Sequence, residues 1–442
     1  MSRKRRKALP PDRQVSIESM SHDGRGVARV DGKAVFVDGA LPGEQVVARY
    51  VSTRRSFDEA SAVEVIAATS TDRVEPRCAH FGVCGGCSLQ HVSETAQRRW
   101  KAQTLKDNLS QIGRVEPETW LEPLHDAIWG YRRKARPGVR YVDKKQRLLI
   151  GFREKKSRYL ADIQHCAVLH PSIGERLPAL STLIAGLSGF RHIPQLEVAV
   201  GDNIAVIVLR HLEPLTDGDI QALQAFSRQH ELWIYLQAAG PDSITPLLPD
   251  TPELFYRPLE NGPTLYFDPT DFTQVNAGLN RQMVAQVKAL LALTPEETLL
   301  DLFCGLGNFS LPLAPTCQQV TGVEGDIALV EKGRQNAQRN HISNATFHKA
   351  DLMADLRGYP WFKTHYDKVL LDPPRSGARE LVEQFEHLAP ERVVYVSCNP
   401  ATLARDAAIL VHDKGYRLLQ AGIMDMFPHT AHVESIAVFE RG

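Results

Sequence analysis

From about residue 266 to the end of the chain, short apolar runs alternate with longer stretches in which apolar residues recur every three or four positions. The short runs predict buried β-strands and the longer stretches predict amphipathic helices, because the two elements bury side chains with different periods. The expected strands are 298–303, 319–324, 346–348, 368–372 and 392–397, and the expected helices between or before them include 278–293 and 329–340. This alternation indicates βαβ units in an α/β Rossmann-like domain with a mostly parallel sheet covered on both faces.

The N-terminal part has a different pattern. Short alternating runs within 13–70 are separated by Asp-Gly and Pro-Gly turns, which predicts a small antiparallel, OB-like β-barrel. Residues 71–265 are mixed α+β, with a helix expected at 93–112 and strands around a turn at 143–144. The chain is therefore expected to be multi-domain, with domains at 13–70, 71–265 and 266–442.

The length and composition agree with this division. A chain of 442 residues is too long for one core, and 43% apolar and 24% charged residues are typical of a globular protein in water. No apolar run approaches the ~18 residues that span a bilayer, and the basic N-terminus has no apolar stretch behind it. We therefore expect a cytoplasmic protein with no membrane association. In such a protein, seven cysteines favour metal binding or catalysis over disulfides.

The net charge of zero conceals a strong local excess of basic residues. Twelve Lys or Arg residues and only two acidic residues lie between Tyr131 and Arg158, a net charge of +10. Tyr131, Tyr141, Phe152 and Tyr159 are interleaved with them. This pattern suits a surface that contacts phosphates and stacks bases, with a solvated basic sheet face as the alternative. The basic run at 3–7 is expected to be a disordered arm that adds RNA affinity.

Three carboxylates and a glycine turn indicate a nucleotide-type cofactor. The strand 299–303 runs into Gly305-Leu306-Gly307, where backbone can approach a ligand closely. Glu324 ends the next strand, where an acidic side chain can hold a ribose diol in NAD enzymes and in S-adenosylmethionine (SAM) enzymes alike, and Asp351 follows the third strand. The segment Asp372-Pro373-Pro374-Arg375 after the fourth strand favours SAM, because nicotinamide enzymes do not need it.

A cysteine and a glutamate near the C-terminus suit methylation at C5 of a pyrimidine. That carbon is a poor nucleophile until a thiolate adds at C6, and a base must later remove the C5 proton. Cys398, in Ser397-Cys398-Asn399-Pro400, fits the thiolate, and Glu434, in His432-Val433-Glu434, fits the base. Taken singly, each residue could also be a structural thiol or a surface carboxylate.

These motifs resemble the signatures of the RNA uracil-C5 methyltransferase family. Phe272-Thr273-Gln274-Val275-Asn276 resembles the entry motif of that family, and 13–70 resembles the TRAM domain of RNA-modifying enzymes. The resemblance implies Cys398 as nucleophile, Glu434 as proton acceptor and Phe272 near a uracil flipped out of its stack. The residues that it implies for SAM binding are Gln274, Phe303, Asn308, Glu324, Asp351 and Asp372.

Four further cysteines, Cys78, Cys84, Cys87 and Cys166, form a separate candidate site. Four soft ligands suit an iron–sulfur cluster or tetrahedral zinc, and the spacing alone does not choose between them. The resemblance of 81–87 to the iron–sulfur members of the family implies a [4Fe-4S] cluster with a structural role. The barrel and the cluster together imply the branch that acts on 23S ribosomal RNA, and we expect a monomer.

Two other functions compete with this interpretation. One is an RNA cytosine-C5 methyltransferase, which shares the attack on C6, and the other is a non-catalytic iron–sulfur protein that binds RNA or assists assembly. Cytosine-C5 chemistry usually places its cysteine beside a proline in a different motif and must handle an N4 amino group. The presence of Cys398 and Glu434 beside the complete set of SAM motifs argues against a non-catalytic protein. The residues themselves do not identify the target uridine or the base-contacting side chains.

Overall fold

The computed structural model describes residues 9–67 and 70–442. Contacts divide the chain into two compact units, the first comprising Met1–Lys101 and Phe427–His432 and the second Ala102–Met426 and Val433–Gly442. The basic run at 3–7 lies outside the described residues. Within the described residues no helix is both long and apolar enough to cross a bilayer. The domain boundaries expected at 70 and 265 stay a prediction.

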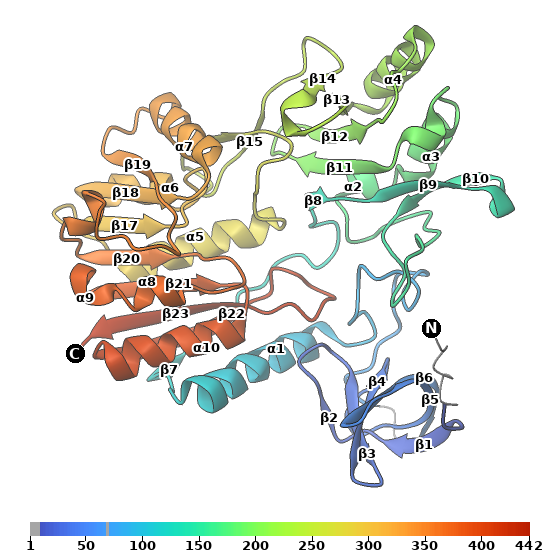
Figure 1. Cartoon of the computed structure of the whole chain (residues 1–442), viewed down its shortest axis with the longest axis horizontal. Helices are drawn as coiled ribbons and strands as arrows, with labels where there is room; N and C mark the ends of the chain where they lie inside the picture. The colour runs from blue at the N-terminus through green and yellow to red at the C-terminus, as the bar shows by residue number, and fades with distance from the viewer. Residues whose placement is uncertain (1–8, 68–69) are drawn as a thin grey trace, which may run out of the picture. The chain divides into compact units, whose positions relative to one another are not determined.

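The first unit contains a six-stranded sheet that curves around its own core (Figure 1). Its strands follow the order β1-β5-β6-β4-β3-β2. Their bounds are β1 Arg13–Ser16, β2 Ser19–Met20, β3 Gly26–Val30, β4 Lys33–Asp38, β5 Gln45–Thr53 and β6 Phe57–Ala67. Alternate side chains such as Val35, Val37, Val46 and Ala48 are buried, as expected for strands with one wet face. The expectation of a wholly antiparallel barrel is wrong for one pair, because β4 and β6 run parallel.

The helix expected at 93–112 is present as α1 (Glu94–Asn108), which continues into a π-helical turn at Leu109–Gly113. The second unit then has a seven-stranded mixed sheet in the order β10-β9-β11-β12-β13-β14, with β8 paired to β11. Its elements are β8 Lys134–Ala135, β9 Gly138–Val142, β10 Arg147–Gly151, α2 Pro171–Gly174, α3 Leu177–Ala185, β11 Gln195–Val200, β12 Ala205–Arg210, α4 Asp217–His230, β13 Leu232–Gln237 and β14 Ile244–Pro246. The turn expected at 143–144 is the 3₁₀ turn Asp143–Lys145 between β9 and β10. A small hairpin, β15 (Leu254–Tyr256) and β16 (Leu265–Phe267), follows.

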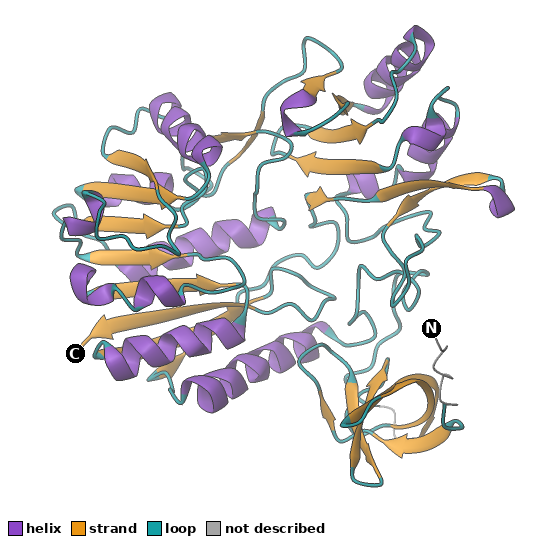
Figure 2. Cartoon of the chain, viewed as in Figure 1, coloured by secondary structure: helices purple, strands orange, loops and turns teal. Residues whose placement is uncertain are grey.

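The largest sheet has eight strands in the order β19-β18-β17-β20-β21-β23-β22-β7. Helices and strands alternate along this part of the chain, as the coloured elements of Figure 2 show. The strands are β7 Thr119–Trp120, β17 Thr298–Leu302, β18 Gln319–Glu324, β19 Ala345–Lys349, β20 Lys368–Leu371, β21 Arg392–Ser397, β22 Tyr416–Met424 and β23 Glu434–Arg441. The helices are α5 Ala277–Leu291, α6 Ser310–Leu313, α7 Ile327–Arg339, α8 Arg379–Val382, α9 Phe385–Leu388 and α10 Pro400–Ala408.

The central strands of this sheet are parallel and almost wholly buried, which explains their continuous apolar sequences. The Rossmann-like α/β prediction is confirmed. The strand order reverses at β17, which has β18 on one side and β20 on the other. In open α/β sheets the ligand binds outside the carboxyl ends of the strands at such a switch point.

Candidate active site

The pairing of β21 with β23 brings the two candidate catalytic residues together. These strands are antiparallel, and their last pair is Ser397 with Ser435. Cys398 follows Ser397 and Glu434 precedes Ser435. The two residues are therefore opposite each other, although 36 positions separate them in the sequence. The Ser435 hydroxyl also donates to the Ser397 carbonyl oxygen at 3.3 Å, which ties the strand ends together at this point.

The segment after Cys398 fixes the sharp turn from strand to helix. Asn399 caps α10, with its side-chain oxygen accepting from the Ala401 N–H at 3.1 Å, and Pro400 occupies the first helical position. The Asn399 side-chain amide donates to the Arg375 carbonyl oxygen at 3.1 Å. Cys398 thus lies between a buried strand and a capped helix, and it is half-buried at the carboxyl end of β21.

Asp372 follows β20, the strand beside β21, and its loop is fastened to α10. The buried Asp406 of α10 accepts from the Ala378 N–H and from the Tyr395 hydroxyl, both at 2.7 Å. Gly377 has a φ of +79°, and a Cβ there would approach the Asp406 carboxylate to 2.6 Å. These contacts join the Asp372 loop, the helix after Cys398 and the strand before it into one rigid assembly.

The electrostatic surroundings of Cys398 are negative. Burial, followed by the charges of Glu434 and Asp372, raises the pKa of the Cys398 thiol to about 11, and Arg375 opposes the shift. The pKa of Asp372 is raised by burial and by the nearby Glu434 and Asp301. Burial and the two carboxylates therefore outweigh the positive charge of Arg375, and the site suits a cationic ligand.

The predicted glycine turn lies directly after β17. Phe303 has a φ of 66°, which is uncommon for a residue other than glycine, and Gly305 follows with a φ of 56°. The Phe303 and Cys304 amides both donate to the Val323 carbonyl oxygen at 2.9 and 3.1 Å. Glu324 reaches back to this turn and accepts from the Gly305 N–H at 3.1 Å. Backbone strain at a ligand turn is a common feature of functional sites.

Asn308 is held by two residues that sequence reasoning missed. Its side-chain oxygen accepts from Asn280 at 2.9 Å and from the Tyr256 hydroxyl at 3.1 Å, and its amide donates back to Asn280 at 3.1 Å. Asn280 lies on the buried face of α5 and Tyr256 in β15. A polar residue inside an apolar helical stripe was the available signal for Asn280.

Asp301 is a third missed residue. It lies in the middle of β17 with no solvent exposure, and its Oδ2 accepts from the Ser310 hydroxyl at 2.5 Å. Its other oxygen, Oδ1, has no hydrogen-bond partner among the described residues. Burial raises the pKa of Asp301 to about 7. A buried, half-satisfied carboxylate at the switch point is a group that a cationic or hydrogen-bonding ligand could satisfy.

The remaining candidates are more exposed. Asp351 follows β19 and accepts from the Met353 N–H at 3.0 Å, which orders its loop. Gln274 is half-buried just before α5. Phe272 is 72% exposed, which is unusual for a phenylalanine and leaves its ring available for stacking.

The four cysteines at 78, 84, 87 and 166 are all half-buried. The first three share one loop of the first unit, whereas Cys166 belongs to the second unit. In the described part of the chain no three His, Cys, Asp or Glu side chains are gathered closely enough to hold a metal ion.

The basic stretch between 131 and 158 is partly neutralised within the fold. In the described residues at least five of its twelve basic side chains form ion pairs, with Asp162, Glu197 or Asp202 as partners. Tyr131 is only 6% exposed, so it is not available to stack bases, whereas Tyr159 is 56% exposed. The expected nucleic-acid surface is therefore smaller than the charge count alone suggests.

Comparisons with known proteins place this site in context. Residues 259–441 match the tRNA (Uracil-5-)-methyltransferase model, and residues 13–63 match the TRAM domain. The chain is 52% identical over 431 residues to the 23S rRNA (uracil(1939)-C(5))-methyltransferase RlmD of Xanthomonas campestris pv. campestris (strain 8004), covering 97% of both chains. It is also 52% identical over 448 residues to the RlmD of Hahella chejuensis, covering 100% of both.

A solved structure supports the fold over the same length. The Pyrococcus abyssi tRNA (uracil-54, C5)-methyltransferase in complex with S-adenosyl-L-homocysteine superposes with a TM-score of 0.72 at 24% identity, covering 97% of this chain and 100% of that one. Fold and site together define a SAM-dependent methyltransferase of the RNA uracil-C5 class, with a TRAM domain at its N-terminus. Within this class, the chain belongs to the family of the 23S rRNA (uracil(1939)-C(5))-methyltransferase RlmD.

Proposed function

We propose that this protein methylates C5 of a uridine in 23S ribosomal RNA through a covalent bond between Cys398 and C6 of the base. The target matches the one in the names of its relatives, uracil 1939. The observation that carries the proposal is the β21–β23 register, which sets Cys398 opposite Glu434. A nucleophile and a base at one strand end are what C5 methylation of a pyrimidine requires.

Each residue then has a defined step. The Cys398 thiolate forms the S–C6 bond, and the electron pair moves to C5. Bound SAM would supply the electrophilic methyl group that C5 takes, with S-adenosylhomocysteine as the leaving group. Glu434 removes the C5 proton, the S–C6 bond breaks, and 5-methyluridine leaves with the thiolate restored.

The acidic residues at the switch point suit a cofactor that carries a sulfonium and an ammonium group. Asp301 Oδ1 is buried without a partner, and Asp372 lies close enough to Asp301 for their charges to interact. Glu324 at the glycine turn, Asn308, Gln274, Phe303 and Asp351 complete the proposed SAM site. The exposed ring of Phe272 would stack against the flipped uracil.

We also propose that Cys78, Cys84, Cys87 and Cys166 hold a [4Fe-4S] cluster. The chemistry of the donor set supports it, because four half-buried thiols are soft ligands. The Gly86 N–H donates to the Cys84 sulfur at 3.4 Å, and hydrogen bonds to the sulfurs tune the reduction potential of such clusters. Anaerobic purification should give a brown protein containing iron and sulfide. Stoichiometric zinc without iron would reject the cluster in favour of a zinc site.

Tritium release tests the proposed reaction. Ribosomal RNA carrying 5-tritiated uridine should release tritium in the presence of SAM and the wild-type enzyme. Cys398→Ala should abolish release, whereas Cys317→Ala, which removes a buried thiol at the far end of the 310–316 segment, should retain it. Unchanged release with Cys398→Ala would reject the covalent mechanism.

We further propose that the enzyme is a cytoplasmic monomer. Light scattering of the purified protein tests the oligomeric state.

A further inference from the structure

The loop that precedes Glu434 is hydrogen-bonded to other residues of the first unit. Phe427–His432 belongs to that unit, although Glu434 lies only two residues further along. The Ser88 and Leu89 amides both donate to the His429 carbonyl oxygen, at 2.8 and 2.9 Å. The His429 N–H donates to Gln97 Oε1 at 2.8 Å, and Lys101 Nζ donates to the Phe427 carbonyl oxygen at 3.0 Å. We call Ser88, Leu89, Gln97 and Lys101 the clamp.

The clamp is costly to build. Gln97 is 1% exposed and Lys101 is fully buried, and burying an amide or an ammonium group is unfavourable unless its hydrogen bonds are specific. The Gln97 amide also donates to the Leu89 and Val92 carbonyl oxygens at 3.2 and 2.8 Å, which fixes its orientation. His429 has a φ of 66°, a strained conformation for this residue. Such strain persists only where the surroundings fix it, and here the fixed segment leads directly to Glu434.

We propose that the clamp is a positioning device for the proton acceptor: it fixes His429 so that the following residues deliver the Glu434 carboxylate to the C5 proton. The inference rests on the proposed role of Glu434 as base. Gln97, Ser88 and Leu89 act only through the loop and touch no substrate.

The kinetic signature of a misplaced base differs from that of general instability. Gln97→Met keeps the volume and removes every hydrogen bond of the clamp amide, so methyl transfer should proceed while proton removal slows at least tenfold. The methylated enzyme–RNA adduct should then accumulate on a denaturing gel. Gln97→Glu keeps an acceptor for the His429 N–H and should restore part of the elimination rate. Gln103→Met is the matched control, because Gln103 is exposed on the same helix.

Hydrogen exchange provides a readout independent of activity. The His429 amide should exchange slowly in the wild type and at least tenfold faster in Gln97→Met, with the rest of the chain unchanged. If the folded Gln97→Met protein accumulates no adduct while Glu434→Gln does, the positioning role is overturned. If Glu434→Gln itself traps no adduct, the assignment of the base fails instead. Should Gln97→Met fail to fold, Gln97→Ala, which also lacks the acceptor for the His429 N–H, is measured for the same adduct, and its absence in the folded protein overturns the proposal.

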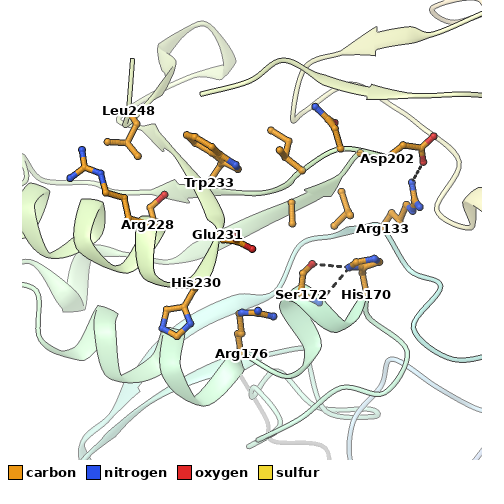
Figure 3. A pocket seen from close by; sticks show the side chains of 16 residues that line it. Arg133, His170, Ser172, Arg176, Asp202, Arg228, His230, Glu231, Trp233 and Leu248 are labelled. Carbon is orange, nitrogen blue, oxygen red and sulfur yellow. Dashed lines mark hydrogen bonds and ion pairs between the residues drawn. The ribbon is translucent and has the colours of Figure 1, made fainter. Parts of the chain in front are cut away.

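A separate observation concerns a hollow in the second unit. A cavity of about 660 Å³ opens between the ends of β12 and β13 and the segment that leads into α3 (Figure 3). Arg133, Arg176 and Arg228 line it, and Trp233 provides an aromatic wall. Its size is within the range of sites that hold a nucleotide-sized ligand.

The charge of this cavity is incompletely neutralised. Arg133 pairs with Asp202 at 2.5 Å, but the same carboxylate also holds Arg281 at 3.0 Å. In the described part of the chain Arg176 and Arg228 form no ion pair, and Glu231 is the other carboxylate of the lining. Burial and the charges of Arg133 and Arg176 lower the pKa of His170. The cavity therefore suits a phosphate beside an aromatic ring.

We infer that this cavity binds one unpaired nucleotide of the RNA substrate, with the base on Trp233 and its phosphates near Arg176 and Arg228. The Arg133 N–H donates to the Val275 carbonyl oxygen at 2.9 Å, so the cavity wall is joined to the segment that carries Phe272 and Gln274. A nucleotide bound here would hold the RNA in register with the flipped uridine. The inference rests on the proposed RNA substrate.

Binding of single-stranded rRNA fragments tests it. Arg176→Gln with Arg228→Gln should weaken binding at least tenfold and lower the slope of log K against log salt by about two. Trp233→Leu should weaken it at low and high salt alike. Arg210→Gln, an exposed arginine outside the lining, is the control. Unchanged affinity in both cavity variants, or binding of free AMP as tightly as RNA, overturns the inference. Tritium release by the wild-type enzyme reports separately on the proposed reaction.

Discussion

Cys398, the residue directly after β21, lies opposite Glu434, the first residue of β23. The antiparallel register fixes this relationship. Ser397 pairs with Ser435, so the residue after Ser397 must lie opposite the residue before Ser435. Two side chains that approach the same pyrimidine, one at C6 and one at C5, need this kind of adjacency. The proposed nucleophile and the proposed base are therefore placed opposite each other by one backbone pairing.

Replacing Glu434 with glutamine separates the two halves of the reaction. Glu434→Gln keeps the shape of the side chain but removes its basicity, so methyl transfer should occur while elimination fails. A covalent protein–RNA band that survives denaturation should appear, with methyl label from SAM. Cys398→Ala combined with Glu434→Gln is the control and should give no band. Absence of the band in the single variant would count against the role of Glu434.

The reactivity of Cys398 should depend on both pH and cofactor. Its pKa is about 11, so the thiolate fraction and the rate of alkylation by iodoacetamide should rise about tenfold per pH unit between 7 and 9. SAM brings a positive sulfonium to a site whose acidic groups raise this pKa, so its binding should lower the pKa and speed alkylation at pH 7. S-adenosylhomocysteine has the same shape without that charge and is the matched control. Equal rates with both ligands would reject the electrostatic activation.

Asp301 should affect stability and cofactor binding in opposite directions. Its folded pKa of about 7 is above the ordinary value, so its contribution to stability is full at low pH and is lost as pH rises through 7. Asp301→Asn keeps an acceptor for Ser310 and removes the unpaired charge. At pH 8 the variant should melt at a higher temperature than the wild type, with a smaller difference at pH 5, while SAM affinity falls about tenfold. Calorimetry of SAM binding and thermal melts at the two pH values check this, and a loss of stability at pH 8 would contradict it.

The sequence predicts this sheet well because its strands are buried on both faces. Val393 to Val396 and Lys368 to Leu371 read as strands without help from the rest of the chain. Cys398 and Glu434 could also be proposed, since their chemistry is specific to the motifs that surround them. The parallel pairing of β4 with β6 could not be predicted, because short alternating strands carry no signal for the direction of their partners.

Most of the residues that sequence reasoning missed act through partners distant in the chain. Asn280 and Tyr256 matter because they hold Asn308, and Gln97 matters because it holds His429, 332 positions away. Nothing in a helix such as α1 distinguishes a glutamine that binds a distant loop from one that faces water. Asp301 is the exception. Burying a carboxylate inside an apolar strand is energetically unfavourable, so such a residue can be recognised in the sequence.

A buried ion pair in the barrel gives the last prediction. Glu44 is fully buried and accepts from Arg73 through both oxygens, at 2.5 and 2.7 Å, and also from the Leu41 N–H at 2.8 Å. Burial opposes ionisation, but the hydrogen bonds and charge of Arg73 outweigh it, so the pKa of Glu44 is lowered. Its contribution to stability is therefore present above about pH 4.5 and is lost as pH falls through the folded pKa.

Arg73→Met leaves a buried carboxylate without its charged partner and should cost ~3–5 kcal/mol of unfolding free energy in urea. Glu44→Gln with Arg73→Met should cost less than Arg73→Met alone, because the stranded charge is gone. Arg13→Gln breaks the exposed pair with Asp31 and should leave the urea midpoint unchanged. A double variant less stable than Arg73→Met would show that the pair acts by shape and not by charge.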